Sequence, residues 1–275
     1  LTDAEIAEAH RSAAMWQDVE LMTGELDGFV SFVHALDWLN LDKDGKALVR
    51  LWLDGRFGDA IPIARGRKEP EGGKARPAEV EAFTEIWRNA RQLIEEERFL
   101  NWQIAFPGVW QDWASGERKG GFDAIVGNPP WDRFEFEEVP WFAARDPEIA
   151  REPLKAKRED MIAALKGLRP DLLRQYNEAQ ERRQQASRVV RTGKIYSELN
   201  SGKLNIYKVF VERSLQMIGS KGMVGVLTPI GIGTDHNVSE FIQRVTDADH
   251  LRAFIAFENR RHWLFEDVHA EAQPT

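Results

Sequence analysis

The chain has 275 residues, of which 43% are hydrophobic and 30% are charged, so it can bury one large core or two small ones. Cysteine is absent, which excludes a disulfide framework and a zinc site with cysteine ligands. The net charge of −8 gives no overall argument for nucleic-acid binding, and no apolar run approaches the roughly 20 residues that span a bilayer. We therefore expect a soluble cytoplasmic protein with no membrane partner.

The first hundred residues (1–100) predict a mainly helical region. Helical patterning runs from the N-terminus to about residue 39, and we expect interruptions at Gly24 and Gly28 because glycine weakens helices. Residues 78–99 predict one further helix, since their apolar side chains recur every three or four positions. Between these helices, residues 65–77 are rich in glycine, proline and charge, which predicts a flexible loop.

An apolar run further along the chain stops abruptly at two prolines. Residues 102–110 predict a strand or extended piece leading toward it, and residues 122–127 predict a short buried strand. The next four residues form what we call the tip: Asn128, Pro129, Pro130 and Trp131. Because proline has no N–H and disfavours a helical residue before it, the tip is held extended. An amide, a carbonyl and a flat ring on one stiff tip can grip a planar group that carries an exocyclic amine.

Residues 151–194 differ in charge from the rest of the chain. They hold twelve Lys/Arg and six Asp/Glu, a local balance of +6, and predict helices broken at Pro170. The rest of the chain then carries −14, since the total is −8. Such a basic helical insertion could face DNA phosphates or another domain, or it could be a solvated surface laced with ion pairs. Charge alone favours the solvated surface.

The C-terminal part of the chain alternates between helical and strand patterns. Residues 205–218 predict an amphipathic helix, residues 223–229 a buried strand that ends at a proline, and residues 238–245 another helix. Residues 251–257 predict a further strand. This alternation indicates an α/β fold with a parallel sheet covered by helices, in which ligands gather at the carboxyl ends of strands. The tip lies at such an end.

At this point residues 122–131 show a resemblance to a known family. They resemble the catalytic motif of the S-adenosylmethionine-dependent DNA adenine-N6 methyltransferases, and look most like the large methylase or fused restriction–modification proteins of type II systems. Residues 1–100 match this family much less clearly. Four further segments are similar to blocks that flank the motif in the family: 101–110, 203–213, 222–229 and 251–265.

The resemblance implies part of a Rossmann-like class I methyltransferase sheet with large helical insertions. Residues 101–150 and 195–275 would then form a partial catalytic domain, with double-stranded DNA as partner and S-adenosylmethionine as cofactor. The Asn128 side-chain oxygen and the Pro129 carbonyl would accept hydrogen bonds from the adenine amine, which favours its attack on a methyl group without a strong base. By the same resemblance, Trp131 would stack on an adenine flipped out of the duplex.

The sequence departs from this family in its cofactor half. The family places a glycine-rich turn for the cofactor before the catalytic motif, and residues 1–127 contain no clear match. The nearest glycine cluster, residues 53–59, follows a helical or mixed run rather than a strand. We therefore expect the chain to be a piece of a longer protein, to depend on that protein's remaining domains, and to bind S-adenosylmethionine weakly or not at all by itself.

Several weaker candidates complete the sequence reading. Arg133, Arg260 and Arg261 are candidate DNA-binding residues, because they follow strands at the expected active edge. Residues 112–119 loosely match a metal-dependent nuclease triad in a polar loop, and the six histidines have no metal-ligand spacing, so no metal site is expected.

Three alternative functions stay open at the level of sequence. A protein glutamine or guanine-N2 methyltransferase could use a similar tip. The chain could also be a DNA-binding or scaffolding module without chemistry, which the missing cofactor turn suggests. The third alternative is an associated endonuclease.

Overall fold

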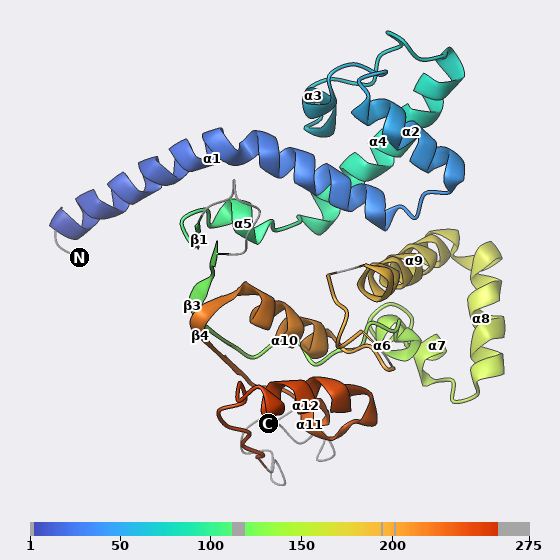
Figure 1. Ribbon diagram of the computed structural model, residues 1–275. Coiled ribbons are helices and arrows are strands. Elements are labelled where there is room, and N and C mark those ends of the chain that lie inside the picture. The colour runs from blue at the N-terminus through green and yellow to red at the C-terminus, as the bar shows by residue number, and fades with distance from the viewer. Residues whose placement is uncertain (1–2, 112–118, 194, 201, 258–275) are drawn as a thin grey trace. The chain divides into compact units, whose positions relative to one another are not determined.

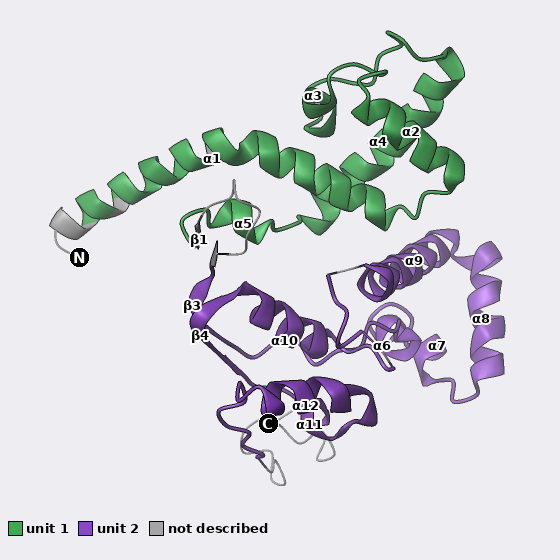
Figure 2. Cartoon of the chain, in the orientation of Figure 1, with its two compact units in different colours: residues 1–119 green, residues 120–275 purple. Residues whose placement is uncertain are grey.

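The chain divides into two compact units, Leu1–Lys119 and Gly120–Thr275 (Figure 2). Both units are mainly helical, and unit 2 also contains a parallel pair of strands (Figure 1). No described helix is long and apolar enough to cross a membrane. The computed structural model describes residues 3–111, 119–193, 195–200 and 202–257.

Unit 1 is built from helices around one apolar core. Long-range contacts join α1 to α3, α4 and α5, and α2 to α4. The helix predicted over residues 78–99 is confirmed as α4, and the mainly helical character of this part of the chain is confirmed with it. The elements are α1 (Asp3–Trp38), α2 (Lys43–Leu53), α3 (Ala60–Ala64), α4 (Pro77–Glu97), α5 (Trp102–Ala105), β1 (Trp110–Gln111) and its partner β2 (Lys119–Gly120).

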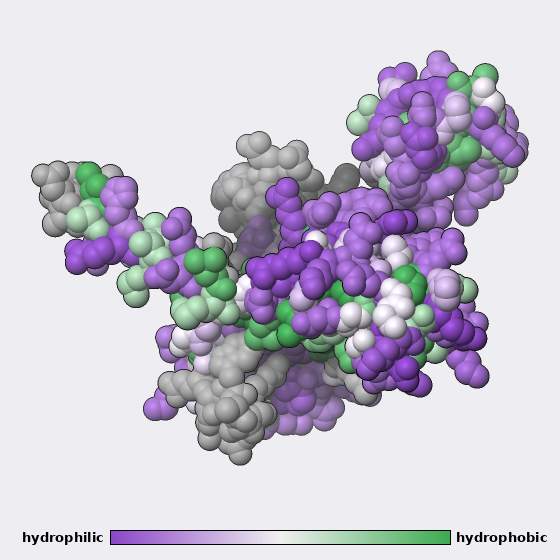
Figure 3. Space-filling model, turned by 90° about the horizontal axis from the view of Figure 1, so that it is seen from above, coloured by the Kyte–Doolittle hydropathy of each residue, from purple (hydrophilic) through white to green (hydrophobic). Residues whose placement is uncertain are grey.

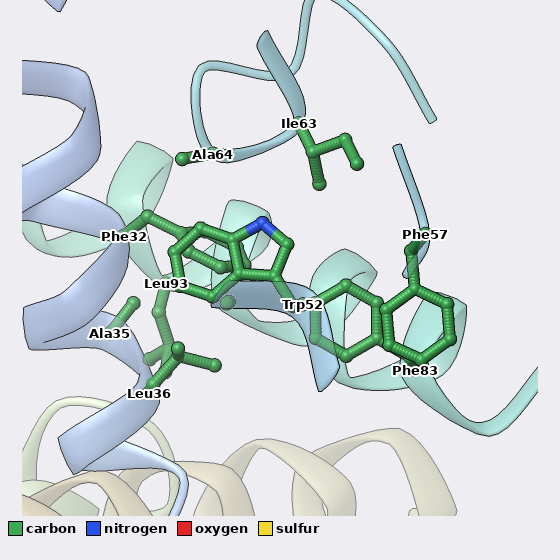
Figure 4. Close-up of a cluster of buried hydrophobic side chains, with 10 residues drawn as sticks. Phe32, Ala35, Leu36, Trp52, Phe57, Ile63, Ala64, Phe83 and Leu93 are labelled. Carbon is green, nitrogen blue, oxygen red and sulfur yellow. The ribbon is translucent and has the colours of Figure 1, made fainter. Parts of the chain in front are cut away.

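Trp52 lies at the centre of this core (Figure 4). Its fully buried ring stacks on Phe29 at a centroid distance of 5.5 Å and meets Phe32 edge-on at 5.0 Å. Phe57 and Phe83 stack beside it with centroids 4.6 Å apart. Because buried aromatic rings remove large apolar areas from water, this cluster holds α1, α2, α4 and the turn after α2 together.

The long helix α1 runs without a break, so the interruptions expected at Gly24 and Gly28 are wrong. Instead, both glycines leave room for the side chain of Arg65, which lies across the helix. A Cβ atom on Gly28 would come within 2.8 Å of Arg65 Cγ. The Arg65 guanidinium bonds Glu25 Oε1 at 3.1 Å. These glycines therefore serve side-chain packing rather than helix termination.

The two glycines of α1 should respond differently to alanine. Gly24→Ala meets only the flexible end of Arg65, 3.3 Å from Nη2, so better helix propensity should stabilise unit 1 by up to about 1 kcal/mol. Gly28→Ala meets the base of the same side chain and must displace it, which offsets that gain and disturbs the pair with Glu25. Thermal unfolding followed by circular dichroism measures the difference. Equal stabilisation by both variants would contradict this account of α1.

Residues 102–110 do not form the strand or extended piece that the sequence predicts, since they begin with the helical turn α5. The Asn101 carbonyl accepts a hydrogen bond from the Ile104 N–H at 2.9 Å and so opens the turn. The buried Asn101 amide donates to Asp27 Oδ1 and Ser31 Oγ, each at 2.9 Å. This long-range anchor to α1 explains the helical turn, and no local pattern in the sequence reveals it.

The glycine- and proline-rich segment 65–77 connects α3 to α4 without regular structure before α4 begins at Pro77, as predicted. The Glu71 N–H donates to the Phe57 carbonyl at 2.8 Å, which ties the segment to the turn after α2. Its flexibility stays a prediction.

In unit 2, a group of four helices follows the tip. Pro170 opens the fourth helix, so the predicted break at this proline is confirmed. Glu138 joins three of the helices: Arg158 donates from Nε to its Oε1, and the Tyr176 hydroxyl donates to its Oε2 at 2.9 Å. Phe142 is fully buried beneath this network. The four helices are α6 (Glu138–Ala143), α7 (Pro147–Arg151), α8 (Lys155–Leu168) and α9 (Pro170–Thr192).

All three tyrosines of the chain, Tyr176, Tyr196 and Tyr207, have raised pKa values because they are buried. Burial, with the hydrogen bond to Glu138, raises the pKa of Tyr176 to about 12. A phenol with a folded pKa above its unfolded value near 10 contributes stability below pH 10, and that stability is lost as the pH rises toward 12. We expect ultraviolet absorbance titration to show tyrosine ionisation centred above pH 10, with the highest step absent in Tyr176→Phe. A folded chain that titrates at pH 10 would refute this.

The rest of unit 2 contains the parallel strands and the helices around them. β3 pairs with β4 in parallel, with Ala124 opposite Met223 and Gly127 opposite Val226. The strands and helices predicted over 122–127, 205–218 and 238–245 are confirmed within a few residues at their ends. The strand predicted over 223–229 is also present, but it begins five residues earlier, at Ile218. These elements are β3 (Phe122–Gly127), α10 (Ile206–Met217), β4 (Ile218–Val226), α11 (Gly231–Thr234), the 3₁₀ turn η2 (His236–Val238) and α12 (Ser239–Asp247).

Two expectations about the sheet are wrong. Residues 251–257 form no strand, because no described strand pairs with them and an extended segment needs a ladder partner. The strands are also not buried on both faces, since Val126 is 84% exposed and Met223 63% exposed. A parallel pair with helices is a mixed α/β fold, as predicted, and its described sheet has two strands.

Candidate active site

The parallel pairing of β3 and β4 brings the carboxyl ends of both strands to the same edge. The tip continues from β3, and Leu227 and Thr228 continue from β4. The Leu227 N–H donates to the Gly127 carbonyl at 3.0 Å, which extends the contact one step past the last paired residues. Thr228 is buried at this edge. The tip therefore starts from a fixed point in the backbone.

Within the tip, the side chains divide between solvent and core. Asn128 and Pro130 are exposed, and Pro129 is buried. Trp131 is half-buried, and its indole Nε1–H donates to the Leu227 carbonyl at 3.4 Å. The Trp131 ring packs against the buried cluster of α10, α11 and α12. The Asn128 amide is thus accessible to a ligand while Trp131 fixes the tip to the core.

The chain is held again where it leaves the tip. The Ile206 N–H donates to the Asp132 carbonyl at 2.9 Å, and the Phe134 N–H donates to the Leu204 carbonyl at 3.0 Å. Between these bonds, Arg133 and Asn205 form an antiparallel bridge. Strand β4 therefore holds the tip at one end and the start of α10 holds it at the other, which gives the tip the rigidity that its prolines predict.

Two polar side chains meet at the start of α10. Burial raises the pKa of Tyr207, and a hydrogen bond with Asn205 partly offsets this increase. Asn205 Oδ1 is buried and has no hydrogen-bond partner among the described residues. Tyr207 also belongs to the cluster on which Trp131 packs. The sequence pattern of residues 205–218 indicates an amphipathic helix and gives no sign of either residue as a site residue.

The buried charges of α10 were also missed. Lys208 is 1% exposed, and its Nζ lies 3.1 Å from Asp235 Oδ2 at the start of η2. Glu212 is 3% exposed and accepts hydrogen bonds from the N–H groups of three consecutive residues. Phe210, by contrast, is an apolar residue of α10 and is 48% exposed. The three donors to Glu212 are Ser197 at 2.7 Å, Glu198 at 3.2 Å and Leu199 at 2.9 Å.

The candidate DNA-binding arginines differ in what the structure says of them. Arg133 is exposed directly after the tip, where its backbone bridges to Asn205. Arg260 and Arg261 lie outside the described residues, as does most of the nuclease-like segment at 112–119. Contact with DNA phosphates stays a prediction for all three arginines.

Many cations of the basic segment 151–194 contact groups within unit 2. Arg191 donates to the carbonyls of Asn200 and Gly202 at 3.1 and 2.9 Å. These contacts agree with the reading of the segment as a solvated, ion-paired surface, and a DNA-facing role stays a prediction. The ion pairs include Lys155–Glu159, Arg158–Glu138, Arg169–Asp146, Arg174–Asp171 and Arg174–Glu178.

The glycine cluster at 53–59 does not fit the cradle that a nucleotide-like cofactor needs. It forms a turn between the helices α2 and α3, with Gly55 and Gly58 at positive φ, and no strand precedes it. Asp59 caps α3 by accepting from the Ile61 N–H at 3.2 Å. Among the described side chains there is also no group of three or more His, Asp or Glu that could hold a metal ion.

Comparison with known proteins supports one class for this architecture. A family model described as Eco57I restriction-modification methylase matches residues 26–150. The matched stretch contains the tip, and it also includes most of unit 1, which the sequence analysis had left outside the resemblance. The match supports a relation to restriction–modification methyltransferases. Neither the curated proteins nor the solved structures gave a match.

Proposed function

We propose that this chain carries the substrate half of a restriction–modification DNA methyltransferase that modifies the N6 amine of adenine. One observation carries the proposal: the exposed Asn128 amide stands at the end of a parallel strand, on a tip held at both ends. The family match over residues 26–150 supports methyl transfer as the reaction class and DNA as the substrate.

The chemistry of the tip suits an exocyclic amine. The lone pair of such an amine is delocalised into the base, so the nitrogen is a poor nucleophile. Acceptors at the Asn128 side-chain oxygen and the Pro129 carbonyl bind its two hydrogens and favour the more tetrahedral nitrogen that forms during attack. The fixed tip holds these acceptors in place, so little entropy is lost as the reaction proceeds.

Trp131 has a double role in this proposal. Its half-buried ring presents an aromatic surface at the tip, on which a flipped adenine would stack and so recover part of the unstacking energy. Its buried side packs on the core and keeps that surface in place. Arg133, one step further along, would contact the DNA backbone beside the flipped base.

S-adenosylmethionine is the methyl donor we propose for the protein that carries this sequence, since the match is to a methylase. It would supply an activated methyl group. The glycine cluster at 53–59 does not provide its cradle, since that cluster joins two helices, and we propose that another part of the protein holds it. The part played by this chain is to hold the target amine.

Product analysis tests the proposal. The protein that carries this sequence is incubated with unmethylated duplex DNA and S-adenosylmethionine bearing a labelled methyl group, and the nucleosides are resolved by mass spectrometry. We expect label in N6-methyladenine. Label in N2-methylguanine or in protein glutamine would overturn the adenine assignment. Cleavage of DNA with magnesium and no methylation would favour the endonuclease, and binding without either reaction would favour a scaffolding module.

A further inference from the structure

A row of apolar side chains follows one face of α1. Their spacings of four, three, four and seven residues are those of a heptad repeat, and at 3.6 residues per turn they align along the helix. At 1.5 Å per residue the row is about 27 Å long. We name it the α1 seam, and it consists of Met15, Val19, Met22, Leu26 and Val33.

Four of the five side chains of the α1 seam are exposed, and the fifth, Val19, is half-buried. Met15 and Met22 are 69% and 75% exposed, and Leu26 and Val33 are 47% and 38% exposed. The core of unit 1 takes the adjoining face of the same helix, on which Phe32 is fully buried. Phe29, three positions after Leu26, stacks on Trp52 and belongs to that core, so the exposed row is interrupted there. Figure 3 shows hydrophobic side chains, in green, among the polar ones along the N-terminal half of α1.

The N-terminal half of α1 also lacks packing that would stabilise a helix. Every described side chain from residue 6 to residue 18 is exposed. Helices without tertiary contacts are marginal in water, and rows of large apolar side chains on a surface mark sites of protein contact. The α1 seam therefore has the geometry of one half of a helix pair.

The charge beside the α1 seam identifies the chemistry of its partner. Residues 3–20 hold five Asp/Glu and one Arg. Asp18, three positions after Met15 and four before Met22, lies directly beside the seam and is exposed. A second copy of α1 would bring no compensating charge, because the whole helix contains no Lys and a single Arg. A partner with Lys or Arg flanking an apolar stripe complements both features.

We propose that the α1 seam docks a basic amphipathic helix of a partner protein in a coiled-coil-like pair. The partner's apolar side chains pack between those of the seam. Its Lys and Arg side chains flank that stripe and face the exposed carboxylates of Glu8 and Asp18. This surface belongs to unit 1 and is independent of the chemistry of the tip.

Synthetic helices of four heptads test the proposal by fluorescence anisotropy with the full chain. The first probe has Leu along one stripe and Lys at the flanking positions, the second replaces Lys by Glu, and the third keeps Lys but replaces Leu by Ser. We expect the first probe to bind at least roughly tenfold more tightly than either of the others. Equal binding of the second or third probe overturns the proposal, as does no binding of the first.

Variants of α1 locate the contact. Met22→Glu should weaken binding of the first probe by roughly tenfold or more. Leu21→Glu is the matched control, since Leu21 is 78% exposed but lies off the seam, and it should keep the affinity of the parent chain. Circular dichroism verifies that both variants stay folded. Sedimentation that shows a dimer of this chain, lost in Met22→Glu, would instead identify a second copy as the occupant and overturn the proposal.

Discussion

An Asn128→Ala variant of the protein that carries this sequence is expected to lose methyl transfer by about 10²–10³-fold. The variant removes the side-chain acceptor at the end of β3 but leaves both prolines and the bonds that hold the tip. Because Asn128 is exposed, its truncation creates no cavity and should leave the melting temperature unchanged. The rate is measured as transfer of a labelled methyl group from S-adenosylmethionine to duplex DNA.

Two further variants sharpen this experiment. Asn128→Asp keeps two oxygen acceptors at the same place and should lose less activity than alanine. Asn177→Ala makes the same chemical change on the exposed surface of α9, far along the chain from the tip, and should keep the parental rate. If Asn128→Ala also keeps the parental rate, the tip does not hold the target amine and the proposed function is wrong.

Glu212→Ala is expected to destabilise unit 2 by about 3–5 kcal/mol, the largest stability effect we expect from one substitution. The buried carboxylate accepts hydrogen bonds from three consecutive N–H groups at residues 197–199. Truncation leaves those donors without partners and opens a void beneath Leu199, which is 1% exposed. Urea unfolding, followed by the fluorescence of Trp131 and its neighbours, measures the change.

Glu212→Gln provides the intermediate case. One oxygen remains, but the new amide group faces a backbone N–H, so this variant should lose less stability than alanine and more than a surface change. Glu181→Gln on exposed α9 is the surface control and should stay within about 0.5 kcal/mol of the parent. An equally small effect of Glu212→Ala would show that segment 195–200 does not depend on this carboxylate.

The sequence predicts elements well where the pattern of apolar residues is long or where proline marks a boundary. Helix α4 follows from its repeat of three and four, and the start of α9 follows from Pro170. Strands β3 and β4 follow from short apolar runs that end at prolines. In each case the signal that identifies the element lies within the segment itself, although the two strands also need each other as ladder partners.

The sequence-based predictions fail where residues far away in the chain determine the local structure. Gly24 and Gly28 lie inside a helix, where the side chain of Arg65, about forty residues on, fills the space beside them. The α5 turn depends on bonds from Asn101 to α1. The local sequence pattern does not show which distant residues will make such contacts. These contacts override the weak helix propensity of a segment.

The residues of the candidate site also divide into those that the sequence predicts and those that it does not. The tip can be predicted from the sequence, because the two prolines that follow the strand restrict the backbone there and an aromatic residue comes next. The burial of Lys208 and Glu212 cannot be predicted from the sequence, because charged residues are expected on the exposed face of a helix. Their burial depends on Asp235 and on segment 195–200, which close over them in the folded chain.

The position of Trp131 couples recognition to folding. Its indole N–H bonds the Leu227 carbonyl and its ring is part of the packing of α10–α12, so the same side chain belongs to the binding surface and to the core. Whatever binds the tip and stabilises this placement of Trp131 also stabilises that core, by thermodynamic linkage. Conversely, damage to the α10–α12 core weakens binding at the tip without touching a ligand. Lost binding in a Trp131 variant therefore measures the sum of two free energies, and only a parallel measurement of unfolding separates the energy of stacking from that of packing.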